Sequence, residues 1–239
     1  MRAGSSMSER AAATRPVPRQ VGWLLRLRRA SLQAPWFKPV LFAFALLPLA
    51  TLLWRAFSVR LGPNPEQTLI WTTGLWALRF LLLTLTITPL RRLTGWAELA
   101  RLRRMLGLFA FSYALLHFSC YFWLVNDFSL DKVAKDVVKH PFVLAGMSAL
   151  TLMLPLAATS TNAMIKRLGG ARWQRLHRLV YLVAPVAVFH FWWFKHAKND
   201  TQEPKLYALL FGTLLAYRAV KAWQAGRSDC ARAKAAART

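Results

Sequence analysis

Three histidines in apolar stretches are the side chains of this chain best suited to hold a metal. His117 lies in LGLFAFSYALLHFSCYFWLV, and His177 and His190 lie thirteen residues apart in WQRLHRLVYLVAPVAVFHFWW, with Pro185 between them. Ionisable side chains are costly inside a membrane, and imidazole is the commonest protein ligand for metals. The pattern favours a haem held between helices. Polar contacts between helices and a proton or ion path are the alternatives.

The two cysteines, Cys120 and Cys230, indicate that such a haem is bound without a covalent link. Neither belongs to a CxxC or CxxCH motif, which argues against an iron–sulfur site and against a c-type haem. The expected cofactor is therefore haem b. The topology predicted below places the two cysteines on opposite sides of the bilayer, so a disulfide between them is excluded.

The histidines must be positioned by membrane-spanning helices, because 56% of the 239 residues are hydrophobic, too many for an ordinary soluble domain. A span needs about 20 mainly apolar residues. The sequence predicts an all-α, polytopic membrane helix bundle with six transmembrane helices. The predicted spans are Phe37 to Phe57, Thr68 to Leu90, Met105 to Val125, Phe142 to Ala158, Leu176 to Phe194 and Leu206 to Val220.

The basic residues predict how the bundle is oriented. Residues 88–104 carry five basic side chains and one acidic, and residues 159–178 carry five basic and none acidic, whereas the other loops are nearly balanced. Because Lys and Arg concentrate in cytoplasmic loops, both basic loops and both termini are expected in the cytoplasm, N-in and C-in. The formal net charge of +24 comes without a nucleic-acid motif, so no nucleic acid is expected as a partner.

Three segments are predicted: a basic cytoplasmic tail over 1–36, the six-helix transmembrane domain over 37–223, and a basic cytoplasmic tail over 224–239. The first tail is too long and too polar for a signal peptide, and it is expected to be mostly disordered and drawn to anionic lipid. It could end in a surface helix, WLLRLRRASL. The outer stretch KVAKDVVKHP could form another.

Helix rise gives the depth of the histidines. His117 lies thirteen residues beyond Arg104, which places it about 20 Å from that boundary in a core about 30 Å thick. His190 lies thirteen residues beyond His177, itself within a basic cluster. His117 and His190 therefore share a level in the outer half and could bind one iron from its two faces. Bis-imidazole ligation leaves no open site and suits electron transfer.

His177 and Arg79 fit this pattern less directly. On an ideal helix His177 points about 140° away from His190, unless Pro185 kinks the helix. A second haem on His177 would need a shared or non-histidine ligand, so one or two haems remain open. Arg79 stands midway along its span, and no predicted span contains Asp or Glu. An anionic group such as a haem propionate, or snorkelling to the outer face, could explain it.

Two further histidines, His140 and His196, fall in outer loops and are expected to be solvated.

Three runs, LWALRFLLLTLTITPLRR, RRMLGLFAFSYALLHFSCY and LAATSTNAMIKRLGGARWQRLHRLVYLVAPVAVFHFWW, closely resemble the MsrQ (formerly YedZ) family, haem-binding membrane subunits of bacterial MsrPQ methionine sulfoxide reductase systems. The resemblance covers about Leu75 to Trp193. It implies the wider ferric-reductase-like transmembrane group, the bacterial inner membrane, and haem b on His117, His177 and His190. It also implies a periplasmic molybdopterin partner, MsrP, electrons from the quinone pool or a cytoplasmic flavin reductase, and FMN as a further cofactor.

Only sixteen residues follow Trp223, too few for a flavin and nicotinamide domain. We therefore expect an electron-transfer subunit that relays electrons outward to a periplasmic reductase, with methionine sulfoxide chemistry on that partner. One alternative is a stand-alone transmembrane reductase for ferric chelates or quinone. Another, of a different class, is a haem-free proton or solute transporter.

Overall fold

The computed structural model describes residues 36–196 and 199–236, with side chains as far as residue 227. The described part is helical and contains no strand. The predicted N-terminal tail, apart from residue 36, and its surface helix lie outside the described residues.

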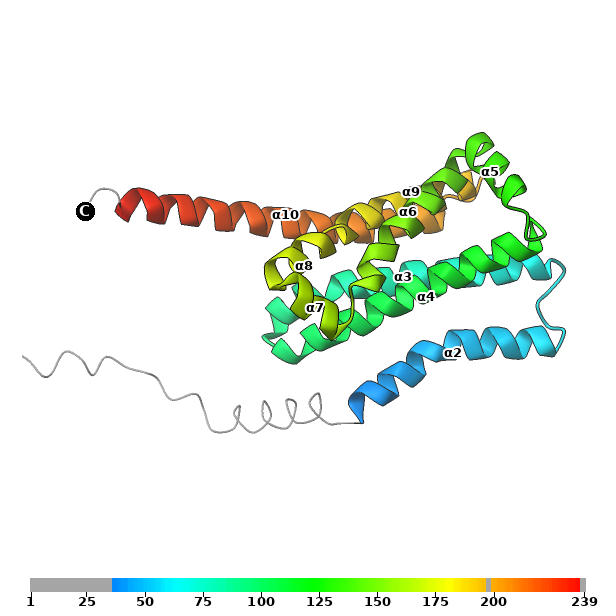
Figure 1. Ribbon diagram of the computed structural model, residues 1–239, viewed down its shortest axis with the longest axis horizontal. Helices are drawn as coiled ribbons and strands as arrows, with labels where there is room; N and C mark the ends of the chain where they lie inside the picture. The colour runs from blue at the N-terminus through cyan, green and yellow to red at the C-terminus, as the bar shows by residue number, and fades with distance from the viewer. Residues whose placement is uncertain (1–35, 197–198, 237–239) are drawn as a thin grey trace, which may run out of the picture.

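Six long helices and several short ones make up the bundle (Figure 1). The long helices are α2 (Phe37–Phe57), α3 (Pro65–Thr94), α4 (Ala100–Leu124), α6 (Pro141–Ala158), α9 (Val180–His196) and α10 (Gln202–Ala236). The short ones are η1 (Ala97–Leu99), α5 (Leu130–Lys139), α7 (Asn162–Leu168) and α8 (Gly170–His177). A helix is confirmed at the stretch that begins with Lys132, as α5, and the first predicted span coincides with α2.

Among the described residues, five segments are long and apolar enough to cross a membrane. They are Phe37–Phe57, Pro65–Thr94, Ala97–Leu124, Pro141–Ala158 and Gly170–His196. The chain is therefore a multi-pass membrane protein. The sixth predicted span lies within α10, a helix of 35 residues that is less apolar and is not among the five.

Two helix pairs form the frame of the bundle. α3 lies along α4 in the most extensive contact, and α6 lies along α9 in the next (Figure 1). α10 runs beside α9 and α3, and its C-terminal part extends beyond the other helices. The α7 and α8 turns lie at the opposite end of the bundle from α5.

Aromatic rings and small residues fill the centre between the helices. The ring of Phe80 stacks on Phe109 at 5.5 Å between centroids and lies 5.2 Å from the ring of Tyr113. Ala110 and Ala184 have no exposed surface. Small residues at helix contacts let backbones approach closely, which is how helices associate in lipid.

Tyr113 also joins α4 to α2 through the backbone of α2. The amide of Leu49 donates to the Tyr113 hydroxyl at 3.1 Å, and that hydroxyl donates to the carbonyl of Ala45 at 3.0 Å. The hydroxyl thus stands where the direct bond from residue 49 to residue 45 would run, next to Pro48, which has no amide hydrogen. An inserted side chain beside a proline is a known cause of helix bending, and α2 is bent in Figure 1.

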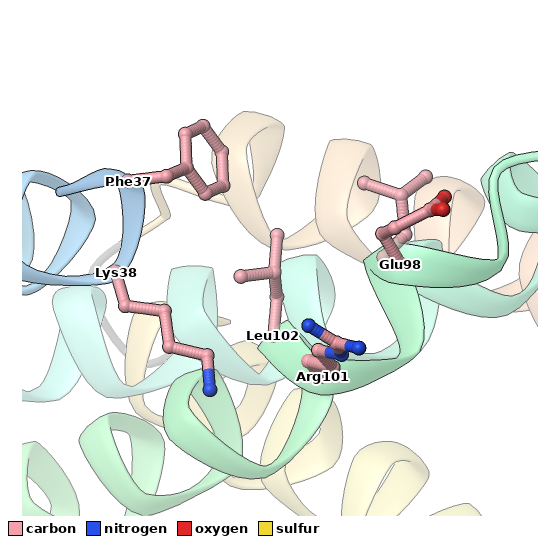
Figure 2. Close-up of a pocket in the computed structure, with 6 residues that line it drawn as sticks. Phe37, Lys38, Glu98, Arg101 and Leu102 are labelled. Atoms are coloured by element: carbon pink, nitrogen blue, oxygen red, sulfur yellow. The ribbon is translucent and has the colours of Figure 1, made fainter. Parts of the chain in front are cut away.

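The first residues of α2 lie against the start of α4. Phe37 and Lys38 line a small pocket with Glu98, Arg101 and Leu102 (Figure 2). Its volume of about 10 Å³ holds roughly one water molecule. The pocket lies at the N-terminal end of α2 and is too small for a cofactor.

Candidate functional site

His117 of α4 and His190 of α9 face each other inside the bundle. Their ring centroids lie 6.1 Å apart and their ring planes are inclined by 78°. The predicted proximity of the two deep histidines is therefore confirmed, while their role as iron ligands stays a prediction. Each long pair of helices, α3 with α4 and α6 with α9, contributes one histidine.

Both imidazoles use the same ring nitrogen for a hydrogen bond to the backbone. The Nδ1 of His117 lies 2.8 Å from the carbonyl oxygen of Ile70, and the Nδ1 of His190 lies 2.6 Å from that of Phe142. A carbonyl oxygen can only accept, so each Nδ1 carries the proton and donates it. Each neutral ring then keeps its lone pair on Nε2, the state in which imidazole binds a metal.

A glycine lies beside each of these rings. A Cβ atom built on Gly74 of α3 would lie 2.8 Å from the Nδ1 of His117, and one built on Gly146 of α6 would lie 2.9 Å from the Nδ1 of His190. Sequence reasoning missed both glycines. A glycine inside an apolar helix is a signal that could have made them candidates for close approach, but it does not name the neighbouring side chain.

The two histidines offer two imidazole nitrogens, which fit the iron of a haem. An imidazole nitrogen binds a first-row metal at about 2 Å, so two rings on opposite sides of one ion have centroids roughly 6 Å apart. The observed separation of 6.1 Å agrees with this value. The described residues hold no group of three or more His, Cys, Asp or Glu side chains that could bind a metal ion. A haem takes only one or two ligands from a protein, and two histidines can supply them.

A lysine and aromatic rings lie next to this pair. Trp71, which follows Ile70, lies 5.6 Å from the ring of Phe191, and the Nζ of Lys195 lies 3.9 Å above the Trp71 ring. Lys195 is buried, and it pairs with Asp200 and, at 3.7 Å, with Glu203. The sequence had placed Lys195 in a nearly balanced outer loop and gave no sign of this cluster.

His177 lies apart from the other two, at the end of α8. Its ring stacks on Trp173 with centroids 3.9 Å apart, and its Nδ1 lies 3.1 Å from the carbonyl oxygen of the same residue. Its Nε2 is buried and has no hydrogen-bond partner in the described part of the chain. One ring nitrogen of His177 is therefore available to a ligand.

The prediction that His177 and His190 lie on one continuous helix, within the span Leu176 to Phe194, is wrong. The helix breaks between α8 and α9, where the amide of Arg178 bonds to residue 175, and the amide of Leu179 to residue 176, in the tighter pattern of a 3₁₀ turn. The ideal-helix angle of about 140° between His177 and His190 therefore does not apply. The break lies six residues before Pro185, which remains inside α9.

Arg79 is half-buried, and its partners come from the protein itself. Its Nε donates to the hydroxyl of Tyr207 on α10 at 3.1 Å, and its guanidinium carbon lies 4.8 Å above the ring of Trp76. Neither partner was foreseen, because a tyrosine on a distant helix gives no signal of its neighbours. His140 and His196 are both exposed, but His196 is the last residue of α9 rather than part of a loop.

The central part of the chain is similar to a known family of membrane proteins. Residues 73–188 match the family described as the ferric reductase like transmembrane component. With its five apolar segments the chain is a multi-pass membrane protein, and its residues 73–188 are similar to this family. No solved structure matches the chain.

The relatives narrow this class to one family. The chain is 48% identical over 206 residues to the protein-methionine-sulfoxide reductase heme-binding subunit MsrQ of Herminiimonas arsenicoxydans, covering 83% of this chain and 94% of that protein. It is 46% identical over 200 residues to MsrQ of Polaromonas naphthalenivorans, covering 84% of this chain and 91% of that protein. It is 48% identical over 189 residues to MsrQ of Bordetella pertussis, covering 78% and 90%. The chain belongs to the MsrQ family.

Proposed function

We propose that this chain is a b-type cytochrome subunit of the bacterial inner membrane that relays electrons outward to a periplasmic molybdopterin reductase, MsrP. That partner would reduce methionine sulfoxide in periplasmic proteins. The observation that carries the proposal is the opposed pair His117 and His190, with ring centroids 6.1 Å apart and each Nδ1 held by a backbone carbonyl. Membership of the MsrQ family, whose members are named as heme-binding subunits, supports it.

The residues of the chain have separate tasks in this proposal. His117 and His190 would hold the iron of one haem b, which when bound would supply a one-electron carrier. The Nδ1–H groups fix the two rings and raise the basicity of Nε2. The helices around the rings exclude water from them, which with the axial ligands sets the reduction potential.

His177 and Arg79 complete the proposed binding residues. His177 would contribute to a second haem position nearer the cytoplasm, supported by its buried Nε2, which makes no hydrogen bond within the described part of the chain. Arg79 would attract an anionic group of the cofactor, because only its Nε makes a hydrogen bond among the described residues. FMN, and a donor that is the quinone pool or a cytoplasmic flavin reductase, are proposed from the family resemblance alone.

The proposed topology has six spans with both ends in the cytoplasm. Residues 37–223 form the membrane domain, and residues 1–36 and 224–239 form basic cytoplasmic segments. The distribution of basic residues supports this topology. Five lie at the α3–α4 turn, namely Arg91, Arg92, Arg101, Arg103 and Arg104. Five more lie around α7 and α8, namely Lys166, Arg167, Arg172, Arg175 and Arg178. Figure 1 places both turns at the same end of the bundle.

The test is a reduced-minus-oxidised spectrum of the purified protein with pyridine haemochrome quantification. We expect at least one haem b per chain, reduced by dithionite and reoxidised when the molybdopterin partner and an oxidised methionine substrate are added. A colourless protein would contradict the proposal and favour a transporter. A haem that ferric chelate reoxidises and the partner does not would point instead to a stand-alone reductase.

A further inference from the structure

The two glycines beside the deep histidines are crowded by those histidines in a way that other helical glycines are not. A Cβ on Gly74 would lie within 3.0 Å of two ring atoms of His117, and a Cβ on Gly146 would lie 2.9 Å from two ring atoms of His190. On α4 itself, a Cβ on Gly107 would meet the Cγ2 of Thr84 at an ordinary 3.7 Å. A Cβ on Gly212 of α10 would meet nothing within 4 Å.

Each crowded glycine lies one turn from the carbonyl that its histidine uses. Ile70 and Gly74 are four residues apart on α3, and Phe142 and Gly146 are four residues apart on α6. Residues four apart share one face of a helix. The imidazole therefore lies against bare backbone at the glycine and donates from Nδ1 to the carbonyl one turn earlier.

A methyl group at either glycine would remove this arrangement. The ring would have to move away from the helix, while the hydrogen bond to the carbonyl tolerates only small changes in distance and angle. The same device occurs twice, on α3 for α4 and on α6 for α9, and the two rings it orients are the two that face each other.

We propose that Gly74 and Gly146 are positioning residues for the two imidazoles, setting the rotation of each ring and keeping the proton on its Nδ1. The inference rests on the proposed function, since the rings are positioned for one haem iron. Partners that orient a metal-binding histidine commonly change affinity about 10- to 100-fold when they are lost. The EPR signal of a low-spin haem with two imidazole ligands would depend on the relative orientation of the two ring planes, which are inclined by 78° in the structure.

The test compares Gly74→Ala and Gly146→Ala with Gly107→Ala, a matched substitution on a helix of the same site. We expect Gly107→Ala to keep the wild-type haem content, EPR signal and reduction potential. We expect each of the other two to bind haem about 10- to 100-fold more weakly. In the fraction that keeps haem, the EPR g values should shift, and the potential should rise because a less basic ligand stabilises the oxidised iron less.

A second measurement covers variants that fail to accumulate. Solid-state ¹⁵N NMR of the histidine-labelled wild-type protein should find Nδ1 of His117 and His190 protonated, and unprotonated Nδ1 atoms would overturn the inference. It is also overturned if Gly74→Ala and Gly146→Ala match Gly107→Ala in haem content, EPR signal and potential, although the wild-type cytochrome would still stand. A wild-type protein without haem is the separate failure of the proposed function.

Discussion

Arg79 has two partners from the protein inside the bundle, the phenol of Tyr207 and the indole of Trp76. An unpaired cation is costly at this depth, and the sequence offered only a cofactor anion or the membrane surface as explanations. The hydroxyl of Tyr207 accepts a hydrogen bond from Nε, and the ring of Trp76 adds a cation–π contact, which leaves the Nη groups for the proposed cofactor anion. Because Tyr207 belongs to α10, the arginine also ties the last helix to α3.

Removing the Tyr207 hydroxyl should show how much its hydrogen bond with Arg79 contributes to the free energy of unfolding. Tyr207→Phe leaves the Nε of Arg79 without its acceptor in apolar surroundings, so we expect the free energy of unfolding to fall by about 1–3 kcal/mol. Thermal unfolding of the purified protein in detergent measures it. Tyr217→Phe on the same helix is the control, because the Tyr217 hydroxyl makes no hydrogen bond in the described part of the chain. Equal stability of the two variants would contradict the interpretation.

The residues that bind and those that orient them differ in how visible they are in the sequence. His117 and His190 were found because histidines are rare in apolar spans and because helix rise converts their spacing into depth. Ile70 and Phe142 could not be found, because the atoms they supply are backbone carbonyls, which every residue has. Whether two helices meet at a given glycine depends on their packing, which a single sequence does not contain.

At the scale of helices, prolines create backbone groups that other helices must satisfy. Pro89 of α3 has no amide hydrogen, so the carbonyl of Leu85 loses its partner within the helix. Arg218 of α10 donates to that carbonyl through Nη2 and to the hydroxyl of Tyr181 through Nη1. Arg218 thus joins α3, α9 and α10 at the point where a carbonyl of α3 has no hydrogen-bond donor within its own helix.

A double-mutant cycle can isolate this contact. Arg218→Gln should lower the free energy of unfolding by about 1–3 kcal/mol, because it leaves the Leu85 carbonyl unpaired. With Pro89→Ala, residue 89 regains an amide for that carbonyl, so the same change should be less destabilising by at least about 0.5 kcal/mol. Lys221→Gln, at an exposed position of α10, is the control. Equal losses in both backgrounds would contradict the capping role of Arg218.

The length of each apolar run predicted the positions of the helices better than it predicted the residues at which they end. The bounds of α2 followed from its apolar run and aromatic ends. The break between α8 and α9 was missed because the apolar pattern continues through Arg178 and Leu179, whose backbone bonds tighten without any glycine or proline. α10 extends beyond the predicted Val220 because its basic stretch is rich in alanine, which favours helix in water as well as in lipid.

At the scale of the whole molecule, the side of the membrane on which the chain ends depends on whether α10 crosses it. Its 35 residues correspond to about 52 Å, more than the hydrocarbon core of about 30 Å. It lies along α9 and α3 and then continues past the other helices (Figure 1). We therefore infer that its first half crosses the membrane within the bundle and that its basic end stands in the cytoplasm.

Reporter fusions to the C-terminus test this topology. A green fluorescent protein fused after Thr239 should fluoresce, and alkaline phosphatase at the same place should be inactive, because six spans return the chain to the cytoplasm. Phosphatase fused after Lys139, at the end of α5, is the matched control and should be active. An active phosphatase after Thr239 would mean that α10 does not cross and that five spans are present.

The central claim is that His117 and His190 hold the same iron, and absorption spectra of single variants test it most directly. His117→Ala and His190→Ala should each abolish the same bis-histidine Soret component of the folded, purified protein, while His140→Ala, at an exposed position, should leave it unchanged. If either deep histidine can be replaced with the full bis-histidine spectrum retained, the two do not share an iron and the account is contradicted.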